Sequence, residues 1–228
     1  MGRGDRRELW NRESGKYVAR AMALAEFPLP PTCLPRPGDW VLDAGCGAGN
    51  HLGMYRLITS TVFGVDLSDA MSRAAARHAV TVQGDVQLLP FRGAAFDYVS
   101  SHVVISHVPD SRAALAELAR VTKAGGRLLL VVPNRWSFIT PMRVLLVRLG
   151  KYTLGSCRHY TVGTLRAEGR AHGLRVVCAA AVQKLPTAPS RLRAVPAWLG
   201  YCLDEAVRRV YTLWGGDLAV LFEKHGAG

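Results

Sequence analysis

The stretch Val41–Gly49, which reads VLDAGCGAG, decides the fold of this chain. An apolar run leads into an acidic residue and then into three glycines at alternate positions. Glycine has no Cβ and tolerates a positive φ, so a ligand can lie against such a turn while its polar groups meet backbone N–H donors. The stretch therefore predicts a buried strand that ends in a ligand-binding turn.

The spacing of the glycines argues against two common nucleotide sites. A dinucleotide fingerprint requires Gly-x-Gly-x-x-Gly, whereas this turn has Gly-x-Gly-x-Gly followed by Asn50. A phosphate-binding P-loop closes with Gly-Lys-Ser/Thr, and the sequence has no lysine between Lys16 and Lys123. We therefore expect neither NAD nor a nucleoside triphosphate at this turn.

Two further acidic residues follow strand-like runs. Asp66 ends the run 61–66, and Asp85 comes directly after Gly84. Open α/β sheets bind ligands at the carboxyl ends of their strands, and a carboxylate there can accept hydrogen bonds from both hydroxyls of a ribose. Each acid could instead serve a turn or a helix cap, but the two positions together favour a nucleoside site.

Apolar and amphipathic segments alternate along the chain, which is typical of an α/β fold with a doubly wound, mostly parallel sheet. The alternation predicts strands at 40–44, 61–66, 80–83, 96–101, 126–132, 174–182 and 218–222. It predicts helices at 5–27, 49–57, 69–78 and 111–122, and one more that Thr161 caps and Gly173 ends.

At this point the chain resembles the class I S-adenosylmethionine-dependent methyltransferases, in particular the small-molecule branch of the methyltransferase domain 11 type. The resemblance covers about residues 38–133 and more loosely the C-terminal part, and the ordered succession of motifs makes it specific. The motifs are Leu42–Gly49, Gly64–Ser68, Gly84–Asp85, Phe96–Val99, His107–Asp110 and Leu118–Gly126. The family's fold implies a seven-stranded Rossmann-like sheet whose last strand is antiparallel.

The resemblance implies a binding site for S-adenosylmethionine and its product S-adenosylhomocysteine. Asp66 would hold the ribose hydroxyls, Asp85 would accept from the adenine amine, and Val86 would offer its backbone N–H to the ring. Asp43 would orient the glycine turn or simply cap it, and Ser101 would lie near the methionine carbons. The remaining residues of this expected site are Gly45, Cys46, Gly47, Gly49 and Leu67.

Candidate catalytic residues follow the fourth strand. His102 and His107 have the side chain suited to accept a proton near neutral pH, although a methyl transfer needs a base only when the acceptor carries a proton that must leave. His107 recurs in the family with different acceptors, which favours a structural hydrogen bond. By the resemblance, His159 and Tyr160 would face the acceptor.

No metal is expected at this site. Some quinone O-methyltransferases of the superfamily carry Glu-x-x-Glu-His after the fourth strand, but here those positions are Val103, Ser106 and His107. A lone imidazole does not hold a divalent ion usefully. The sequence therefore predicts metal-independent transfer.

Length and composition are those of one enzyme-sized domain over 1–228, of which 49% of residues are hydrophobic. A helix and a proline-rich linker are expected over 1–37 and the cofactor-binding core over 38–133. Inserts at 134–160 and 184–215 would form a lid over the acceptor or cover the sheet. The scattered cysteines and the absence of a leader-like apolar run indicate a reducing cytoplasm. A monomer or a homodimer is expected.

The formal net charge of +12 raises the alternative of a nucleic-acid methyltransferase acting on RNA. The chain lacks the Asn/Asp-Pro-Pro-aromatic turn that holds a flipped base, and Ser100–Val103 stands in its place. A small apolar or aromatic acceptor, methylated at O, N or C, is therefore favoured, with an anionic membrane surface as a peripheral contact. A cofactor-binding partner subunit without catalysis is the third alternative.

Overall fold

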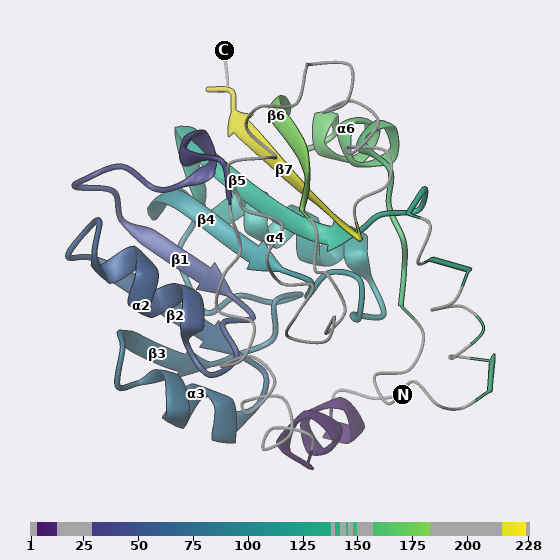
Figure 1. Cartoon of the computed structure of the whole chain (residues 1–228). Coiled ribbons are helices and arrows are strands. Elements are labelled where there is room, and N and C mark those ends of the chain that lie inside the picture. The colour runs from purple at the N-terminus through teal and green to yellow at the C-terminus, as the bar shows by residue number, and fades with distance from the viewer. Residues whose placement is uncertain are drawn as a thin grey trace, which may run out of the picture.

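The computed structural model describes residues 4–12, 29–137, 157–182 and 216–226, together with positions 140, 141, 145, 148 and 149. Within them, one sheet of seven strands runs through the molecule in the order β3-β2-β1-β4-β5-β7-β6 (Figure 1). The strands are β1 (Val41–Ala44), β2 (Val62–Asp66), β3 (Val80–Gln83), β4 (Phe96–His102), β5 (Thr122–Pro133), β6 (Leu174–Val182) and β7 (Asp217–Lys224).

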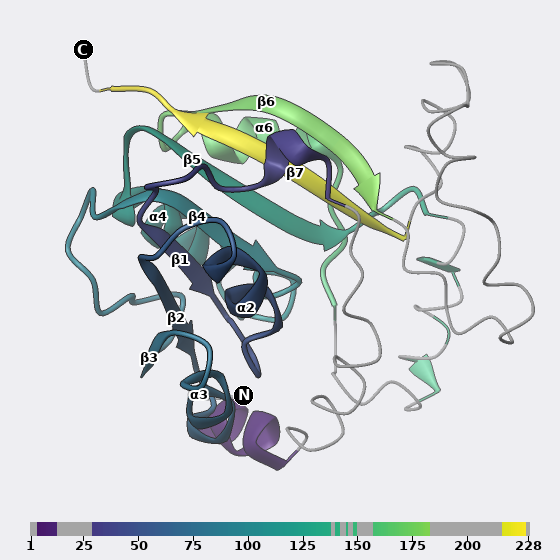
Figure 2. The same cartoon turned by 60° about the vertical axis from the view of Figure 1, so that its left-hand side comes forward.

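The sheet is parallel except at one edge. β1, β2, β3, β4 and β5 pair in parallel, whereas β7 lies antiparallel between β5 and β6 (Figure 2). This arrangement confirms the predicted α/β class, the doubly wound sheet and the antiparallel last strand. The strand order reverses between β1 and β4, which is where an open α/β sheet forms a crevice for ligands.

Helices cover both faces of the sheet. Their bounds are α2 (Asn50–Arg56), α3 (Asp69–Ala75), α4 (Ser111–Val121) and α6 (Val162–Arg170), with the 3-10 turn η1 (Pro31–Cys33) and a helix over 4–12. Leu115 of α4 and Leu165 of α6 belong to one hydrophobic cluster, and Leu52 and Tyr55 of α2 belong to the other.

β5 separates the two clusters by simple alternation. Leu128, Leu130 and Val132 join the first cluster, whereas Leu129 and Val131 join the second. A strand buried on both faces reads as a continuous apolar run rather than as an alternating one. The run LLLVV in this strand therefore follows from its central place in the sheet.

Many element boundaries differ from the sequence prediction by one to three residues, and the start of β5 differs by four. β5 begins at Thr122 rather than 126, because Thr122 already has extended backbone angles and its hydroxyl caps the carbonyl of Leu118 at 2.7 Å. The predicted helix over 5–27 is described only for 4–12.

The segments predicted as a lid lie mostly outside the described residues. The insert 184–215 is not among them, and of 134–160 the described parts are the two ends and a few isolated positions. Those ends meet, because Asn134 pairs with Tyr160 as an isolated bridge. In the part of the chain that is described, no helix combines the length and apolarity needed to cross a bilayer.

Candidate functional site

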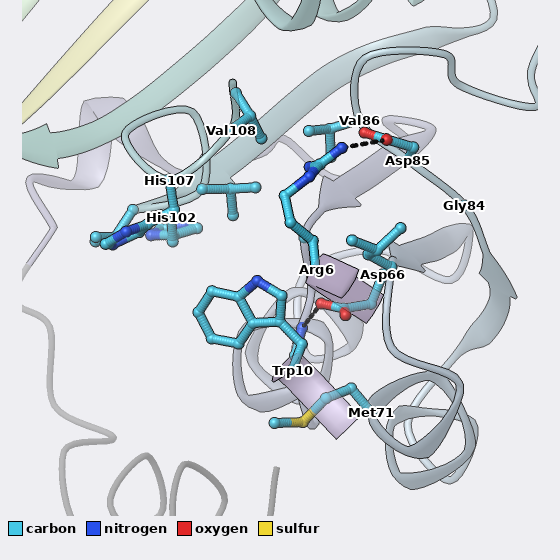
Figure 3. Close-up of a pocket in the computed structure, with 15 residues that line it drawn as sticks. Arg6, Trp10, Asp66, Met71, Gly84, Asp85, Val86, His102, His107 and Val108 are labelled. Atoms are coloured by element: carbon cyan, nitrogen blue, oxygen red, sulfur yellow. Dashed lines mark hydrogen bonds and ion pairs between the residues drawn. The ribbon is translucent and has the colours of Figure 1, made fainter. Parts of the chain in front are cut away.

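A pocket lies at the carboxyl ends of β1, β2 and β4 and over the loop after β3 (Figure 3). It brings together most of the predicted site residues, namely Gly45, Gly47, Asp66, Leu67, Asp85, Val86, His102 and His107. Asp43, Cys46, Gly49, Ser101, His159 and Tyr160 are not among its lining residues. Their roles stay predictions.

The glycine turn after β1 forms one wall of the pocket, and Gly45 in this turn has no room for a side chain. Gly45 has a φ of +80°, and a Cβ built there would lie 2.2 Å from Cγ2 of Val104. Gly47 also has a positive φ and donates its backbone N–H to Oδ2 of Asp66 at 2.9 Å. The alternate glycines therefore let the turn pass close to the strand ends and hold the acid of β2.

Asp66, at the end of β2, keeps acceptor capacity. Its Oδ1 accepts from the backbone N–H of Ser68 at 2.9 Å, and its Oδ2 accepts from Gly47. Each carboxylate oxygen has about two lone-pair sites, so these two bonds leave room for further donors. Burial raises the pKa of Asp66 above its ordinary value, although the backbone N–H groups oppose that shift.

Asp85, on the loop after β3, has its carboxylate fully engaged. Gln87 donates from its backbone N to Oδ1 and from Nε2 to both oxygens, at 3.0–3.1 Å. Arg6 adds an ion pair from Nη2 to Oδ2 at 3.1 Å. Burial pushes the pKa of Asp85 upward, but the Gln87 hydrogen bonds and the Arg6 charge outweigh it and hold the pKa below its ordinary value.

The helix over 4–12 contributes Arg6 and Trp10 to the pocket lining, and sequence reasoning missed this role. Arg6 reaches across the pocket to Asp85, and Trp10 lies on the side of the histidines (Figure 3). Asn11 accepts a hydrogen bond from the Ser68 hydroxyl at 2.5 Å, which ties the helix to the start of α3. No local motif announces such docking. The other lining residues that were not predicted are Met71, Gly84, Val103, Val104 and Val108.

His102 ends β4 and is nearly buried, with 9% of its surface exposed. Its Nε2 lies 3.1 Å from the Tyr55 hydroxyl. Its ring stacks on His51 with centroids 3.7 Å apart and an interplanar angle of 11°. Two side chains of α2 thus fix the orientation of His102 at the pocket wall.

His107 faces the pocket from the loop after β4. Its Nε2 lies 3.8 Å from Sγ of Cys157, and its ring meets Trp10 edge-on with centroids 6.1 Å apart. The segment that follows Cys157 packs along the same loop, since the backbone N–H of Arg158 donates to the Ser106 carbonyl at 3.0 Å. His159 thus directly follows two residues, Cys157 and Arg158, that contact the loop after β4. Tyr160 is 2% exposed and lies in the core.

The backbone turns sharply between these histidines. Val103 has a φ of +61°, which is rare for a β-branched residue. Its N–H donates to the carbonyl of Val131 at 2.7 Å, so the sheet holds the residue in place. This turn brings Val104 over Gly45.

Asp43 and Ser101 lie behind the pocket wall. Asp43 is 1% exposed and accepts from the Ser100 hydroxyl at 2.9 Å, while its Oδ2 has no hydrogen-bond partner among the described residues. Burial and, less strongly, the negative charge of Asp66 raise the pKa of Asp43 to about 7, against the Ser100 hydrogen bond. The hydroxyl of Ser101 is likewise buried and has no hydrogen-bond partner among the residues that the structure describes.

Comparison with known proteins finds a family that resembles the stretch containing this site. Residues 42–130 match the family described as methyltransferase domain. The match confirms the expected resemblance of this stretch to the class I S-adenosylmethionine-dependent methyltransferases. The match includes the glycine turn, Asp66, Asp85 and both histidines of the methyltransferase domain's pocket wall.

Curated relatives resemble the methyltransferase domain over part of their length. Malonyl-[acyl-carrier protein] O-methyltransferase of Serratia marcescens is 41% identical over 98 residues, which cover 41% of this chain and 38% of the relative. Demethylmenaquinone methyltransferase of Mycolicibacterium paratuberculosis is 35% identical over 116 residues, covering 49% and 50%. The chain thus spans half or less of the length of these relatives.

A solved structure matches the fold over nearly the whole chain. It is the complex between the Haloferax volcanii Trm112 methyltransferase activator and a putative methyltransferase. The TM-score is 0.69 at 21% identity, and the match covers 97% of this chain and 98% of that one. At this identity the likeness shows the fold alone.

The residues of the methyltransferase domain fit the cofactor of the family at its ribose end. Asp66 has lone pairs to accept two hydroxyls, and the adjacent turn has no side chain at Gly45 or Gly47 that would fill the space. The fit at the adenine end is incomplete, since the Asp85 carboxylate is already engaged by Gln87 and Arg6.

Proposed function

We propose that this protein transfers a methyl group from S-adenosylmethionine to O, N or C of a small apolar or aromatic acceptor, without a metal. The observation that carries the proposal is a half-buried carboxylate with spare acceptor capacity, Asp66, beside a turn that has no side chain at Gly45 or Gly47. When bound, the cofactor supplies an electrophilic methyl carbon, so the protein's main task is to hold the acceptor in line with it.

The proposed roles of the cofactor-binding residues follow from their positions. Asp66 accepts the ribose hydroxyls, and Asp85 and Val86 meet the adenine ring. Asp43 and Ser101 support the turn from behind, where buried oxygen atoms without partners among the described residues are available to polar groups or water. The backbone of Gly45, Cys46, Gly47 and Gly49 borders the methionine portion, and Leu67 borders the ribose.

His102 is the base that we favour for an acceptor that must lose a proton. A general base has to be held in a fixed orientation within hydrogen-bond reach of the proton that it removes. The Tyr55 hydroxyl and the stacked ring of His51 supply that orientation for His102. His107 is the second candidate, since it lines the same pocket against Trp10.

The apolar lining supports an apolar or aromatic acceptor. Val103, Val104 and Val108 line the pocket beside Trp10 and the histidines. The relatives' names include a carrier-bound malonyl group and a demethylated menaquinone as methyl acceptors. A thioester-bound acyl group and a quinone are therefore the first acceptor classes to test. His159 is proposed at the acceptor side, and the core position of Tyr160 favours a supporting role there.

Turnover of the cofactor separates this proposal from its alternatives. The purified protein would be incubated with S-adenosylmethionine and, separately, a malonyl thioester, demethylmenaquinone and RNA, with S-adenosylhomocysteine quantified after a fixed time. Release that depends on a small acceptor supports the proposal. Release that depends only on RNA would support the alternative suggested by the net charge of +12. Cofactor binding without any turnover would indicate a partner subunit, and loss of turnover in a chelator would refute metal independence.

The role of His102 has its own test. We expect His102→Gln to lower kcat by about 10²-fold on a protonated acceptor, the usual contribution of a general base, with unchanged affinity for S-adenosylhomocysteine. His107→Gln is the matched variant on the same wall, and His172→Gln, after α6, is the control outside the pocket lining. A normal kcat for His102→Gln with a large loss for His107→Gln would reassign the base.

A further inference from the structure

The ion pair between Arg6 and Asp85 lies where the proposed function needs a hydrogen-bond acceptor. The exocyclic amine of adenine is a donor, and by the proposed function Asp85 accepts from it. The carboxylate already receives four hydrogen-bond contacts, two at each oxygen. Two oxygens offer about four lone-pair sites, so the carboxylate as it stands has none left for the amine.

One of its present partners must therefore move, and Gln87 is the better anchored. Gln87 donates to Asp85 from its backbone and from its side chain. Its Oε1 also accepts from the backbone N–H of Asp110, the N-cap of α4, at 3.0 Å. Moving this side chain would break the hydrogen bonds that its Nε2 donates and the one that its Oε1 accepts.

Arg6 is held much less firmly at this point. Its guanidinium reaches Oδ2 of Asp85 through Nη2, while its Nε is buried with no hydrogen-bond partner among the described residues. Leaving a buried donor without a partner is unfavourable. The ion pair is nevertheless well shielded, with side-chain exposures of 9% for Arg6 and 5% for Asp85.

We infer that Arg6 occupies the place of the adenine amine at Asp85, and that cofactor binding displaces it, so that docking of Arg6 and of the adenine ring exclude each other. The inference rests on the proposed function. Arg6 is thus an intramolecular competitor of the cofactor, carried by the helix over 4–12 (Figure 3). A protein whose binding-competent state is only partly populated has an apparent affinity reduced by that fraction.

The competition predicts that removing the guanidinium strengthens cofactor binding. The test is calorimetric titration of S-adenosylhomocysteine into the full chain and into Arg6→Met, which keeps an unbranched apolar side chain in the pocket. We expect the Kd to fall by about tenfold, the gain when roughly a tenth of the wild-type molecules are open. Arg7→Met is the matched control, because Arg7 is the exposed neighbour with the same charge, and its Kd should stay within about twofold of wild type.

Titration with adenosine alone locates the effect. Adenosine has the base and the ribose without the methionine portion, so the gain in Arg6→Met should be retained with this probe. A gain confined to S-adenosylhomocysteine would place the influence of Arg6 at the methionine end and overturn the inference. Arg6→Ala, followed together with its thermal unfolding, repeats the measurement should Arg6→Met pack poorly.

The opposite results are equally informative. An increased Kd in Arg6→Met would show that Arg6 contacts the bound cofactor, and an unchanged Kd would show that the ion pair does not oppose binding; either overturns the inference while leaving the proposed function intact. The proposed function fails separately, and the inference with it, if neither wild type nor Arg6→Met gives heat with S-adenosylhomocysteine or adenosine.

Discussion

Asp66 ends β2, Asp85 follows the neighbouring strand β3, and both line one pocket, but their carboxylates differ in hydrogen-bond partners and in the direction of their pKa shift. Asp66 accepts two backbone N–H groups, retains lone pairs, and has a pKa raised chiefly by burial. Asp85 is surrounded by side-chain donors, one of them a cation, and its pKa is lowered. By the proposed function, the ribose end of the pocket is thus preformed, whereas the adenine end is paired with Arg6.

The largest expected effect is at the preformed end. Asp66→Ala should weaken binding of S-adenosylhomocysteine by about 1–3 kcal/mol, the range for the loss of charge-assisted hydrogen bonds. Calorimetry measures it, and Asp69→Ala is the control, since this acid lies in the first turn of α3 and pairs with Arg73 rather than with the pocket. Equal affinity of Asp66→Ala and wild type would remove Asp66 from the site.

Asp43 is a buried carboxylate, and we expect it to make the stability of the fold depend on pH. The pKa of Asp43 is about 7 in the folded protein, against 3.8 for the ordinary group. A raised folded pKa means that the folded chain binds the proton more tightly, so this contribution to stability is full below the unfolded pKa and is lost as pH rises through about 7. Between pH 5 and 7 the free energy of unfolding should therefore fall by on the order of 2 kcal/mol on account of Asp43.

Chemical denaturation at several pH values checks this expectation. Asp43→Asn should remove that part of the pH dependence, whereas Asp69→Asn should retain it. If Asp43→Asn and wild type lost stability in parallel over this range, the carboxylate would be ionised throughout and its burial would be compensated by a group outside the described residues.

The smallest effect should be at Asp85, and it should depend on Arg6. In wild type, Asp85→Asn removes an acceptor for adenine but also releases Arg6, so we expect a loss of only about 0.5–1 kcal/mol in affinity for S-adenosylhomocysteine. In the Arg6→Met background nothing offsets the loss, and it should at least double. A double-mutant cycle measures the coupling, and additive losses would mean that the two residues act independently on the cofactor.

The sequence predicts the features of the fold and the site that depend on residues close together along the chain. The glycine turn, the acids at the ends of β2 and after β3, and the alternation of strands and helices follow from side-chain spacing along the chain. All seven strands lie within a few residues of their predicted ranges, and the pocket contains Asp66, Asp85, His102 and His107. Local pattern is enough here because each of these features is built from residues close in sequence.

The other half depends on contacts between distant segments. Arg6 meets a residue 79 positions away, and Tyr55 meets His102 across 47 positions. Nothing in the sequence around Arg6 distinguishes it from its neighbour Arg7, which is exposed. Hydrophobic periodicity indicates which side of a helix is buried. It does not indicate with which carboxylate an arginine of that helix forms an ion pair.

Val103 shows where the fold accepts conformational strain. A left-handed β-branched residue is held at a cost of roughly 1–3 kcal/mol, and such residues concentrate at functional sites. Glycine would relieve the strain, but it would also remove an apolar group from the wall between the two histidines. A substitution that relieves the strain at Val103 would therefore stabilise the fold but change the shape of the cavity. We expect variants selected for higher thermal stability to change at this position and, by the proposed function, to discriminate less well between acceptors.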